Sequence, residues 1–181
     1  MKVFVEGEEE TTSHLPAFVR AHPEFFRCDL FVVADTGNIS VGDPVLTTTL
    51  RGEVSCIIEV RTLERAVHSG SFGGPAPDAL AALIRILSTL HDQQGNVAVK
   101  GLHRSAPGTA EYPEDLFRQN AGVLPGVDLI GTGSLGSRLW SRPSVTVIGI
   151  DAPSVAGSSN ILITRASAKV SMRIAPDADP G

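Results

Sequence analysis

Two stretches in which apolar and polar residues alternate constrain the fold of this chain more than any other feature. Residues 54–60 place apolar side chains at every second position, with Ile57 as the one exception, and residues 168–174 repeat the pattern. Because successive side chains of a strand point to opposite faces, this spacing predicts antiparallel strands with one buried and one wet face. The apolar positions are Val54, Cys56, Ile58, Val60, Ala168, Val170, Met172 and Ile174.

The segment between these stretches contains a helix that could cover the apolar face. Leucine and isoleucine recur at helical spacing from residue 78 to residue 91, and Gly95 offers a stop. Residues 145–150 predict another strand, and residues 114–120 predict a short helix. The rest of residues 101–143 has no strong periodicity and is interpreted as an excursion between strands.

The beginning of the chain follows a different pattern, that of a parallel β-α-β unit. Apolar segments at residues 3–5 and 30–33 flank a helical segment, and both read as strands buried on two faces. We therefore expect an α/β chain in two parts. Residues 1–45 would be a β-α-β piece of a parallel-sheet domain. Residues 46–181 would be an α+β domain, an antiparallel β-sheet with helices on one face.

Composition excludes several classes of function. Fifteen basic and twenty acidic residues give a net charge of -5 without any basic run, which argues against a nucleic-acid partner. Apolar stretches fall far short of the roughly 18 residues that a membrane span needs, so no membrane partner is expected. Cys28 and Cys56 are too few and too distant for a disulfide framework, and we expect buried small side chains. No signal peptide opens the chain, so a cytoplasmic location is expected.

The densest group of potential catalytic side chains is acidic. Glu6, Glu8, Glu9 and Glu10 follow the first predicted strand, and Asp35 follows the second. The carboxyl ends of neighbouring parallel strands open at one edge of a sheet, so these carboxylates are expected to converge. Such a cluster repels itself unless it holds a cation or a proton. The residues alone leave open a divalent metal site, an acid/base pair or a solvated acidic loop.

The pattern Glu-Gly-x-Glu-Glu at residues 6–10 resembles the catalytic segment of the M20 metallopeptidases, a family that includes carnosinases, other dipeptidases, aminoacylases and succinyl-diaminopimelate desuccinylases. The resemblance implies that Glu9 is the general base and that Glu10 and Asp35 bind metal. Residues 67–74 resemble the loop of the family's lid domain whose histidine, here His68, reaches into the active site of the partner subunit.

Two further segments extend the resemblance, residues 158–160 and 168–176. They are similar to the lid segments whose asparagine and arginine contact substrate, which implies that Asn160 and Arg173 are substrate-binding residues. The family's chemistry then implies zinc, two ions in the complete enzyme, with manganese or cobalt as alternatives. Zinc would activate a water molecule, Glu9 would accept its proton, and His68 would stabilise the oxyanion.

The resemblance also implies substrates and partners. The expected substrate is a dipeptide or an N-acyl amino acid, whose polar backbone and carboxylate Asn160 and Arg173 would hold. The expected assembly is a homodimer formed through the lid and dimerisation domain at residues 46–181. Within that domain, the helix at residues 78–91 and an edge strand are expected to pair with their twins.

The chain departs from the family pattern at several metal ligands. It has no His-x-Asp motif, and neither the aspartate that bridges the metals nor the distal histidine has a match. The sequence therefore resembles an internal fragment, with its lid truncated at the C-terminus, and we expect the isolated chain to be inactive. The alternative function is that of a non-catalytic dimerisation module.

Simpler interpretations of three of the proposed site residues remain open. Arg173 could form an ion pair across the sheet with Glu59 or Glu53. Asn160 could cap a turn, and His68 could be a polar loop residue without a role in catalysis.

Overall fold

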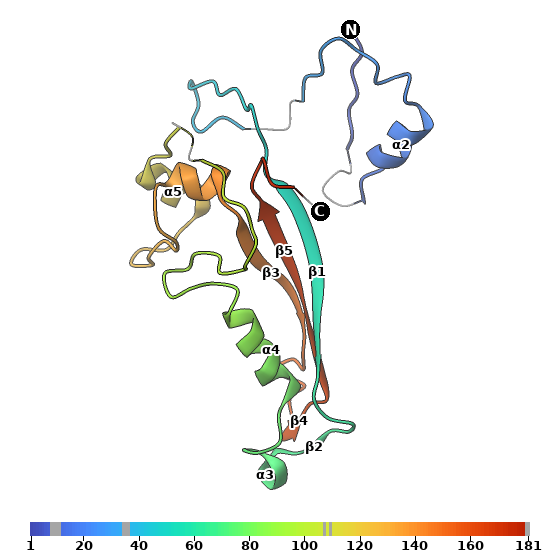
Figure 1. Cartoon of the computed structure of the whole chain (residues 1–181), viewed down its shortest axis with the longest axis vertical. Coiled ribbons are helices and arrows are strands. Elements are labelled where there is room, and N and C mark those ends of the chain that lie inside the picture. Colours follow the sequence, from blue (N-terminus) through green and yellow to red (C-terminus); the bar gives the residue numbers. More distant parts are fainter. Residues whose placement is uncertain (8–11, 34–36, 107, 109, 180–181) are drawn as a thin grey trace. The chain divides into compact units, whose positions relative to one another are not determined.

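A computed structural model of the chain describes all residues except 8–11, 34–36, 107, 109 and 180–181. The chain divides into two compact units, Met1–Val45 and Leu46–Gly181 (Figure 1). Among the described residues, no helix has the length and apolar character that crossing a membrane requires.

The second unit is built on an antiparallel sheet of three strands in the order β1-β5-β3 (Figure 1). Strand β5 lies in the centre, and its Ala166, Ala168 and Val170 are buried. The alternating patterns therefore predicted the sheet correctly, although each strand extends beyond the predicted range. The strands span Gly52–Arg61 in β1, Ser144–Asp151 in β3 and Arg165–Ile174 in β5.

The pairing register determines which residues lie at each end of this sheet. Strands β1 and β5 pair without interruption, from Gly52 opposite Ile174 at one end to Arg61 opposite Arg165 at the other. Two further strands, β2 (Val67–His68) and β4 (Ile161–Leu162), pair with each other. Because β2 follows β1 and β4 precedes β5, this small sheet lies beyond the Arg61–Arg165 end (Figure 1).

Helix α4, Ala79–Ser88, packs on one face of the three-stranded sheet. It begins at Asp78, whose Oδ1 accepts a hydrogen bond from the Ala81 N–H at 2.9 Å. The other carboxylate oxygen of Asp78 accepts the N–H of Ile163 at 2.8 Å, which ties the helix start to the segment between β4 and β5. The helix predicted at residues 78–91 is confirmed and ends slightly earlier.

The core between α4 and the sheet is small and covers only part of β1. Leu83 and Ala79 are fully buried and form a cluster with Ala166 and Ala168 of β5. Ile58, Val60, Leu80, Leu87 and Ile163 pack around this cluster. Residues 52–57 of β1 lie outside this core and are exposed.

Both cysteines are exposed, so the prediction of buried thiols was wrong. Cys56 lies in the half of β1 that the core around Leu83 does not reach, and its face of the strand is therefore open. Cys28 lies outside the helices and strands of the first unit. An apolar position in a strand is buried only where another layer covers it.

Short helical segments occur outside the core helix. Helix α5, Glu114–Ala121, confirms the helix predicted at residues 114–120 and ends at Gly122, whose φ of 64° is left-handed. The glycine-rich loop before α4 contains one turn of helix, α3, Ser69–Phe72. A π-helix, η1, spans Ser137–Ser141. The last two were not predicted, because segments of four or five residues carry no readable periodicity.

The first unit contains helix α2, Leu15–Ala21. Residues 3–5 and 30–33, expected to be the flanking strands, are described but form neither strand, and their side chains are exposed. Of the expected β-α-β unit, the structure therefore has only the helix. A parallel strand buried on both faces needs neighbouring strands and covering layers, and the described part of this unit supplies neither.

Aromatic contacts hold the first unit together instead of a sheet. The Phe18 ring lies 5.4 Å from that of Phe4, 6.0 Å from that of Phe25 and 5.9 Å from that of Phe26, centroid to centroid. Lys2 also donates to the Phe25 carbonyl oxygen at 2.9 Å. Tilted and edge-on ring pairs at these separations are favourable.

Candidate active site

The predicted metal site cannot be built from the described residues. Glu9, Glu10 and Asp35 lie outside them. Their neighbour Glu6 is described, and its Oε1 accepts the N–H of His14 at 2.8 Å and of Leu15 at 3.2 Å at the start of α2. No three His, Cys, Asp or Glu side chains in the described parts of the chain could together hold a metal ion. The metal ligands therefore remain predictions from the sequence.

His68 lies at the end of β2, opposite Ile161 of β4, and its side chain is exposed. Its Nδ1 accepts the N–H of Gly70 at 3.1 Å, which caps the short helix α3. A neutral imidazole that accepts through Nδ1 carries its proton on Nε2. The Gly70 N–H thus orients the His68 ring, and a neutral ring in this orientation would offer Nε2–H as its donor.

Asn160 lies beside His68, immediately before β4, and its side chain is exposed. The carbonyl oxygen of Asn160 accepts the N–H of Ser69 at 2.9 Å. This backbone bond and the pairing of His68 with Ile161 fix the two segments against each other. His68 and Asn160 therefore form one polar pair at the β2-β4 end of the unit.

Arg173 lies on β5, directly opposite Glu53 of β1. Its Nη1 is 3.2 Å from the Glu53 Oε2, which confirms one of the cross-strand partners expected for it. The side chains are 49% and 48% exposed, and such an ion pair contributes at most about 1 kcal/mol to stability. The guanidinium can therefore exchange Glu53 for the carboxylate of a ligand at little cost.

Glu59, the other expected partner of Arg173, is bound elsewhere. Its carboxylate lies 2.6 Å from Arg61 Nε and 2.5 Å from Arg165 Nη2. The hydrogen bond from Arg61, together with the charges of Arg165 and Arg61, lowers the pKa of Glu59. These three residues mark the end of the main sheet that lies toward His68.

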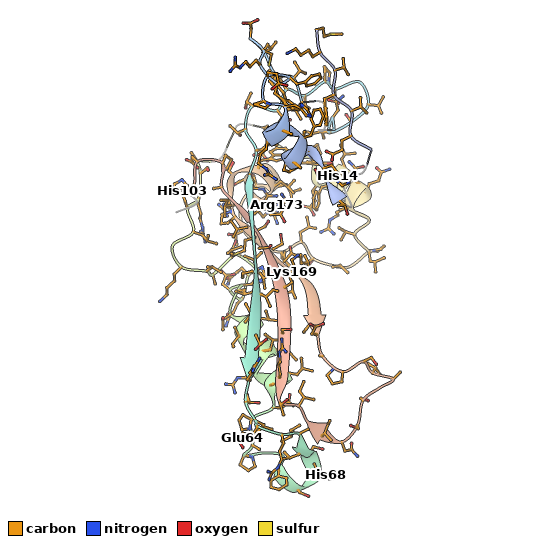
Figure 2. All side chains as sticks on the ribbon, turned by 90° about the vertical axis from the view of Figure 1, so that its right-hand side faces the viewer. His14, Glu64, His68, His103, Lys169 and Arg173 are labelled. Carbon is orange, nitrogen blue, oxygen red and sulfur yellow. The ribbon has the colours of Figure 1, made fainter. Side chains whose placement is uncertain are left out.

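Arg173 and His68 lie at opposite ends of the sheet within one chain (Figure 2). Arg165 and Arg173 are already separated by about 26 Å along β5, at roughly 3.3 Å per residue. His68 lies beyond the Arg165 end. A dipeptide spans only about 7 Å, so one bound substrate cannot touch both side chains of a single chain.

This geometry also separates Asn160 from Arg173. The sequence resemblance assigned both residues to substrate binding and implied no distance between them. In the structure, Asn160 shares its end of the sheet with His68. Any site that uses all three side chains must therefore combine two copies of the second unit.

Comparison with known proteins places the second unit in a family. Residues 48–181 match the family model for the peptidase dimerisation domain of M20 peptidases. The chain therefore belongs to the M20 peptidase dimerisation domain family. Its mixed α/β architecture, with an antiparallel sheet and helices, agrees with that assignment.

Several relatives of known function are dipeptidases. The chain is 40% identical over 179 residues to the cysteinylglycine-S-conjugate dipeptidase of Corynebacterium striatum. It is 26% identical over 193 residues to the Beta-Ala-His dipeptidase of Mus musculus, and 27% identical over 190 residues to the Cys-Gly metallodipeptidase DUG1 of Saccharomyces cerevisiae. These alignments cover 96%, 99% and 96% of this chain, but only 39% of each relative.

Solved structures of dipeptidases have a similar fold. Human carnosine dipeptidase 1 superposes with a TM-score of 0.72 at 27% identity, over 96% of this chain and 39% of that one. The dipeptidase Dug1p of Saccharomyces cerevisiae has a TM-score of 0.73 at 24% identity, over 97% and 39% of the two chains, and shows the fold alone. The chain thus spans about two fifths of the length of the proteins that it matches.

Proposed function

We propose that this chain serves a metal-dependent hydrolase that cleaves the amide bond of a dipeptide or an N-acyl amino acid. Residues 46–181 would be its lid and dimerisation domain, and residues 1–45 would belong to its metal-binding catalytic domain. The names of the relatives support this activity. The arrangement of the site is inferred from one observation, which is that His68 and Asn160 lie far from Arg173 within one chain.

The site would be completed by a second copy of the chain. A two-fold axis places the same surface of each subunit against the other, and can bring the His68 end of one lid to the Arg173 end of its twin. Each site would then use Arg173 from one subunit and the pair His68 and Asn160 from the other. The arrangement gives every site the three side chains that no single chain can bring together.

Each side chain would have a distinct task. The Nε2–H of His68 would donate to the oxyanion that forms when the amide carbonyl is attacked, which lowers the barrier to reaction. Arg173 would leave Glu53 and bind the substrate carboxylate through the two parallel bonds that a guanidinium offers. The Asn160 amide can both donate to and accept from the substrate backbone.

The proton transfer and the metal belong to residues outside the described parts of the chain. We propose Glu9 as the general base, and Glu10 and Asp35 as ligands of zinc, or of manganese or cobalt. A divalent metal in that position would supply Lewis-acid chemistry toward the amide. The name metallodipeptidase, carried by the DUG1 relatives, supports metal dependence. We also propose a cytoplasmic location, with which the two free, exposed cysteines agree.

The proposal is tested in the whole protein by removing the Arg173 side chain, which would bind the substrate carboxylate. Arg173→Ala should lower kcat/KM for a dipeptide by about 10- to 100-fold, the value of a charge-assisted hydrogen bond. The same variant should be indistinguishable from the parent on a dipeptide amide, which has no terminal carboxylate. Lys169→Ala, an exposed cation on the same strand, is the matched control and should change neither substrate's rate. Equal losses on both substrates would refute the assigned role.

The alternative is that the 181-residue chain by itself is a non-catalytic dimerisation module. The match of residues 48–181 to a dimerisation domain favours it. Sedimentation equilibrium with and without zinc, combined with a dipeptide hydrolysis assay, separates the two cases. A metal-independent dimer without activity supports the module. A chain that hydrolyses dipeptides only when zinc is added would overturn it.

A further inference from the structure

A cavity of about 200 Å³ in the second unit is lined by three arginines. Arg104 and Arg138 come from the excursion between α4 and β3, and Arg142 lies two residues before β3. His91 and the first residues of β3 complete the wall. His68, Asn160 and Arg173 do not line the cavity, although Arg173 lies directly opposite Ser144 of its wall across the sheet, so the cavity adjoins the Arg173 end of the sheet.

Two glycine turns clasp each other to form one wall of the cavity. The Gly131 N–H donates to the Gln94 carbonyl oxygen at 2.7 Å, and the Thr132 N–H donates to the Asn96 Oδ1 at 2.9 Å. Gly95 has a φ of 80°, and a Cβ there would lie 2.7 Å from the Cβ of Ile130. Only glycine allows Gly95 to lie this close to Ile130, so the backbone fixes this wall of the cavity without a ligand.

Backbone carbonyl groups hold the three guanidinium groups in place. Arg138 Nη1 donates to the Ile130 carbonyl at 2.8 Å, Arg142 Nη1 to that of Thr132 at 2.7 Å, and Arg104 Nη2 to that of Val97 at 3.3 Å. Each guanidinium has five N–H donors, so most of its donors remain for another partner. The three side chains are therefore positioned while retaining capacity to bind.

The three cavity arginines form no ion pair with a carboxylate in the described part of the chain. The ion pairs of arginine within the described part of the chain involve Arg61, Arg118, Arg165 and Arg173, and none of the three cavity arginines. The neighbouring carboxylate of Asp92 accepts the N–H groups of Gln94 and Asn96 at 2.9 and 2.8 Å, and it forms no ion pair with the three arginines within the described residues. Positive charges that share a cavity repel each other unless an anion lies among them.

Two further observations, both on described residues, indicate donors and positive charge without a partner at this cavity. The Nε of Arg138 is buried and has no hydrogen-bond partner among the residues that the structure describes, whereas buried donors are nearly always paired. Arg51 adds another cation at the edge of the cavity, since its Nη1 donates to the Arg142 carbonyl at 3.3 Å and to Ser144 Oγ at 3.2 Å. Burial, followed by the charge of Arg173, lowers the pKa of Arg51.

We propose that this cavity binds a small oxyanion, a phosphate or a small carboxylate, through Arg104, Arg138 and Arg142. The planar guanidinium fork matches the paired oxygens of such anions. The volume suits a small ion, because pockets for drug-sized ligands measure about 300–1,000 Å³. Bound anion would hold the excursion against β3 and so stabilise the second unit.

The test is binding of inorganic phosphate to the 181-residue chain by calorimetry and thermal melting, at constant ionic strength against chloride. Saturating phosphate should raise the melting temperature by about 3 °C or more. Acetate and succinate form a second arm, which shows whether carboxylates or phosphate bind more tightly. A phosphate effect no larger than that of chloride, together with no carboxylate effect, overturns the proposal.

Variants locate the bound ion. Arg104→Gln should weaken binding about 10-fold, and it leaves the fold intact because Arg104 makes one long bond to a carbonyl. Arg138→Lys keeps the charge, removes the orphaned Nε donor and should weaken binding similarly. Arg118→Gln, a half-buried arginine paired with Glu114 in the same excursion, is the control and should bind normally. Unchanged affinity in the folded Arg104 and Arg138 variants would contradict the assignment. Binding is the readout, so the result does not depend on peptidase activity.

Discussion

The role proposed for His68 depends on a glycine two residues later. A Cβ at Gly70 would lie 2.8 Å from Cε1 and 3.1 Å from Nδ1 of the His68 ring. Gly70→Ala should therefore displace the ring, break the bond from the Gly70 N–H and lower kcat of the whole protein about 10-fold or more. Gly108→Ala, where a Cβ meets nothing within 4 Å, is the control.

Nitrogen NMR provides a readout that does not depend on activity. The parent should show the His68 tautomer protonated on Nε2, because Nδ1 accepts a hydrogen bond. Gly70→Ala should shift His68 toward a mixture of tautomers. A parent that is protonated on Nδ1 would contradict the role of His68 as an Nε2–H donor.

A second residue-scale prediction concerns Asp177 and pH. The Ser105 hydroxyl donates to the Asp177 Oδ1, and this bond, followed by His103 at 3.2 Å, lowers the pKa of Asp177. A lowered folded-state pKa gives stability that is present above the unfolded value, about 3.9, and is lost as pH falls through the folded pKa. Ser105→Ala should therefore raise the Asp177 pKa and reduce stability at neutral pH.

Carboxyl NMR titration and urea unfolding at several pH values test this prediction. The stability difference between parent and Ser105→Ala should shrink once the pH lies below the folded pKa of Asp177. Ser158→Ala removes an exposed serine that bonds the Val155 carbonyl, and should show no such pH dependence. A constant difference across the acid range would count against the Ser105 contact.

At the scale of elements, the docking of α4 depends on Leu83. Its side chain is fully buried among alanines, and truncation leaves a cavity that this small core cannot refill. Leu83→Ala should lower the free energy of unfolding by about 2–5 kcal/mol. Ile84→Ala, one residue along and 53% exposed, should cost less than about 1 kcal/mol. Similar losses in urea denaturation would show that α4 does not dock through Leu83.

The elements with clear periodicity could be predicted from the sequence. Alternation at residues 54–60 and 168–174 gave the paired strands β1 and β5, and helical spacing gave α4. Residues 3–5 and 30–33 were misread as strands, because their apolar character says nothing about whether neighbouring strands are available.

The candidate sites were predictable to different degrees. His68, Asn160 and Arg173 could be selected from local motifs, but their separation depends on the register of β1 with β5. The arginines of the cavity are scattered over a segment without periodicity. The clasped glycine turns form the wall to which two of them are bonded, and no spacing rule records such a contact.

At the scale of the whole molecule, each lid would supply half of the proposed site. The second unit belongs to a dimerisation-domain family, and its substrate-binding candidates lie at the two ends of one sheet. Isologous pairing of two such units makes two identical sites, each with residues from both subunits. A monomeric form of the whole protein should therefore lack activity even with metal bound.

Activity in a mixed dimer tests this claim most directly. His68→Ala and Arg173→Ala versions of the whole protein, each strongly impaired on a dipeptide as a homodimer, would be co-expressed with different tags and purified as the heterodimer. One of its two sites would then combine an intact Arg173 with an intact His68 from the other subunit, so about half of the wild-type activity should return. A heterodimer as strongly impaired as its parents would show that both residues serve the same subunit's site, and the shared-site account would be wrong.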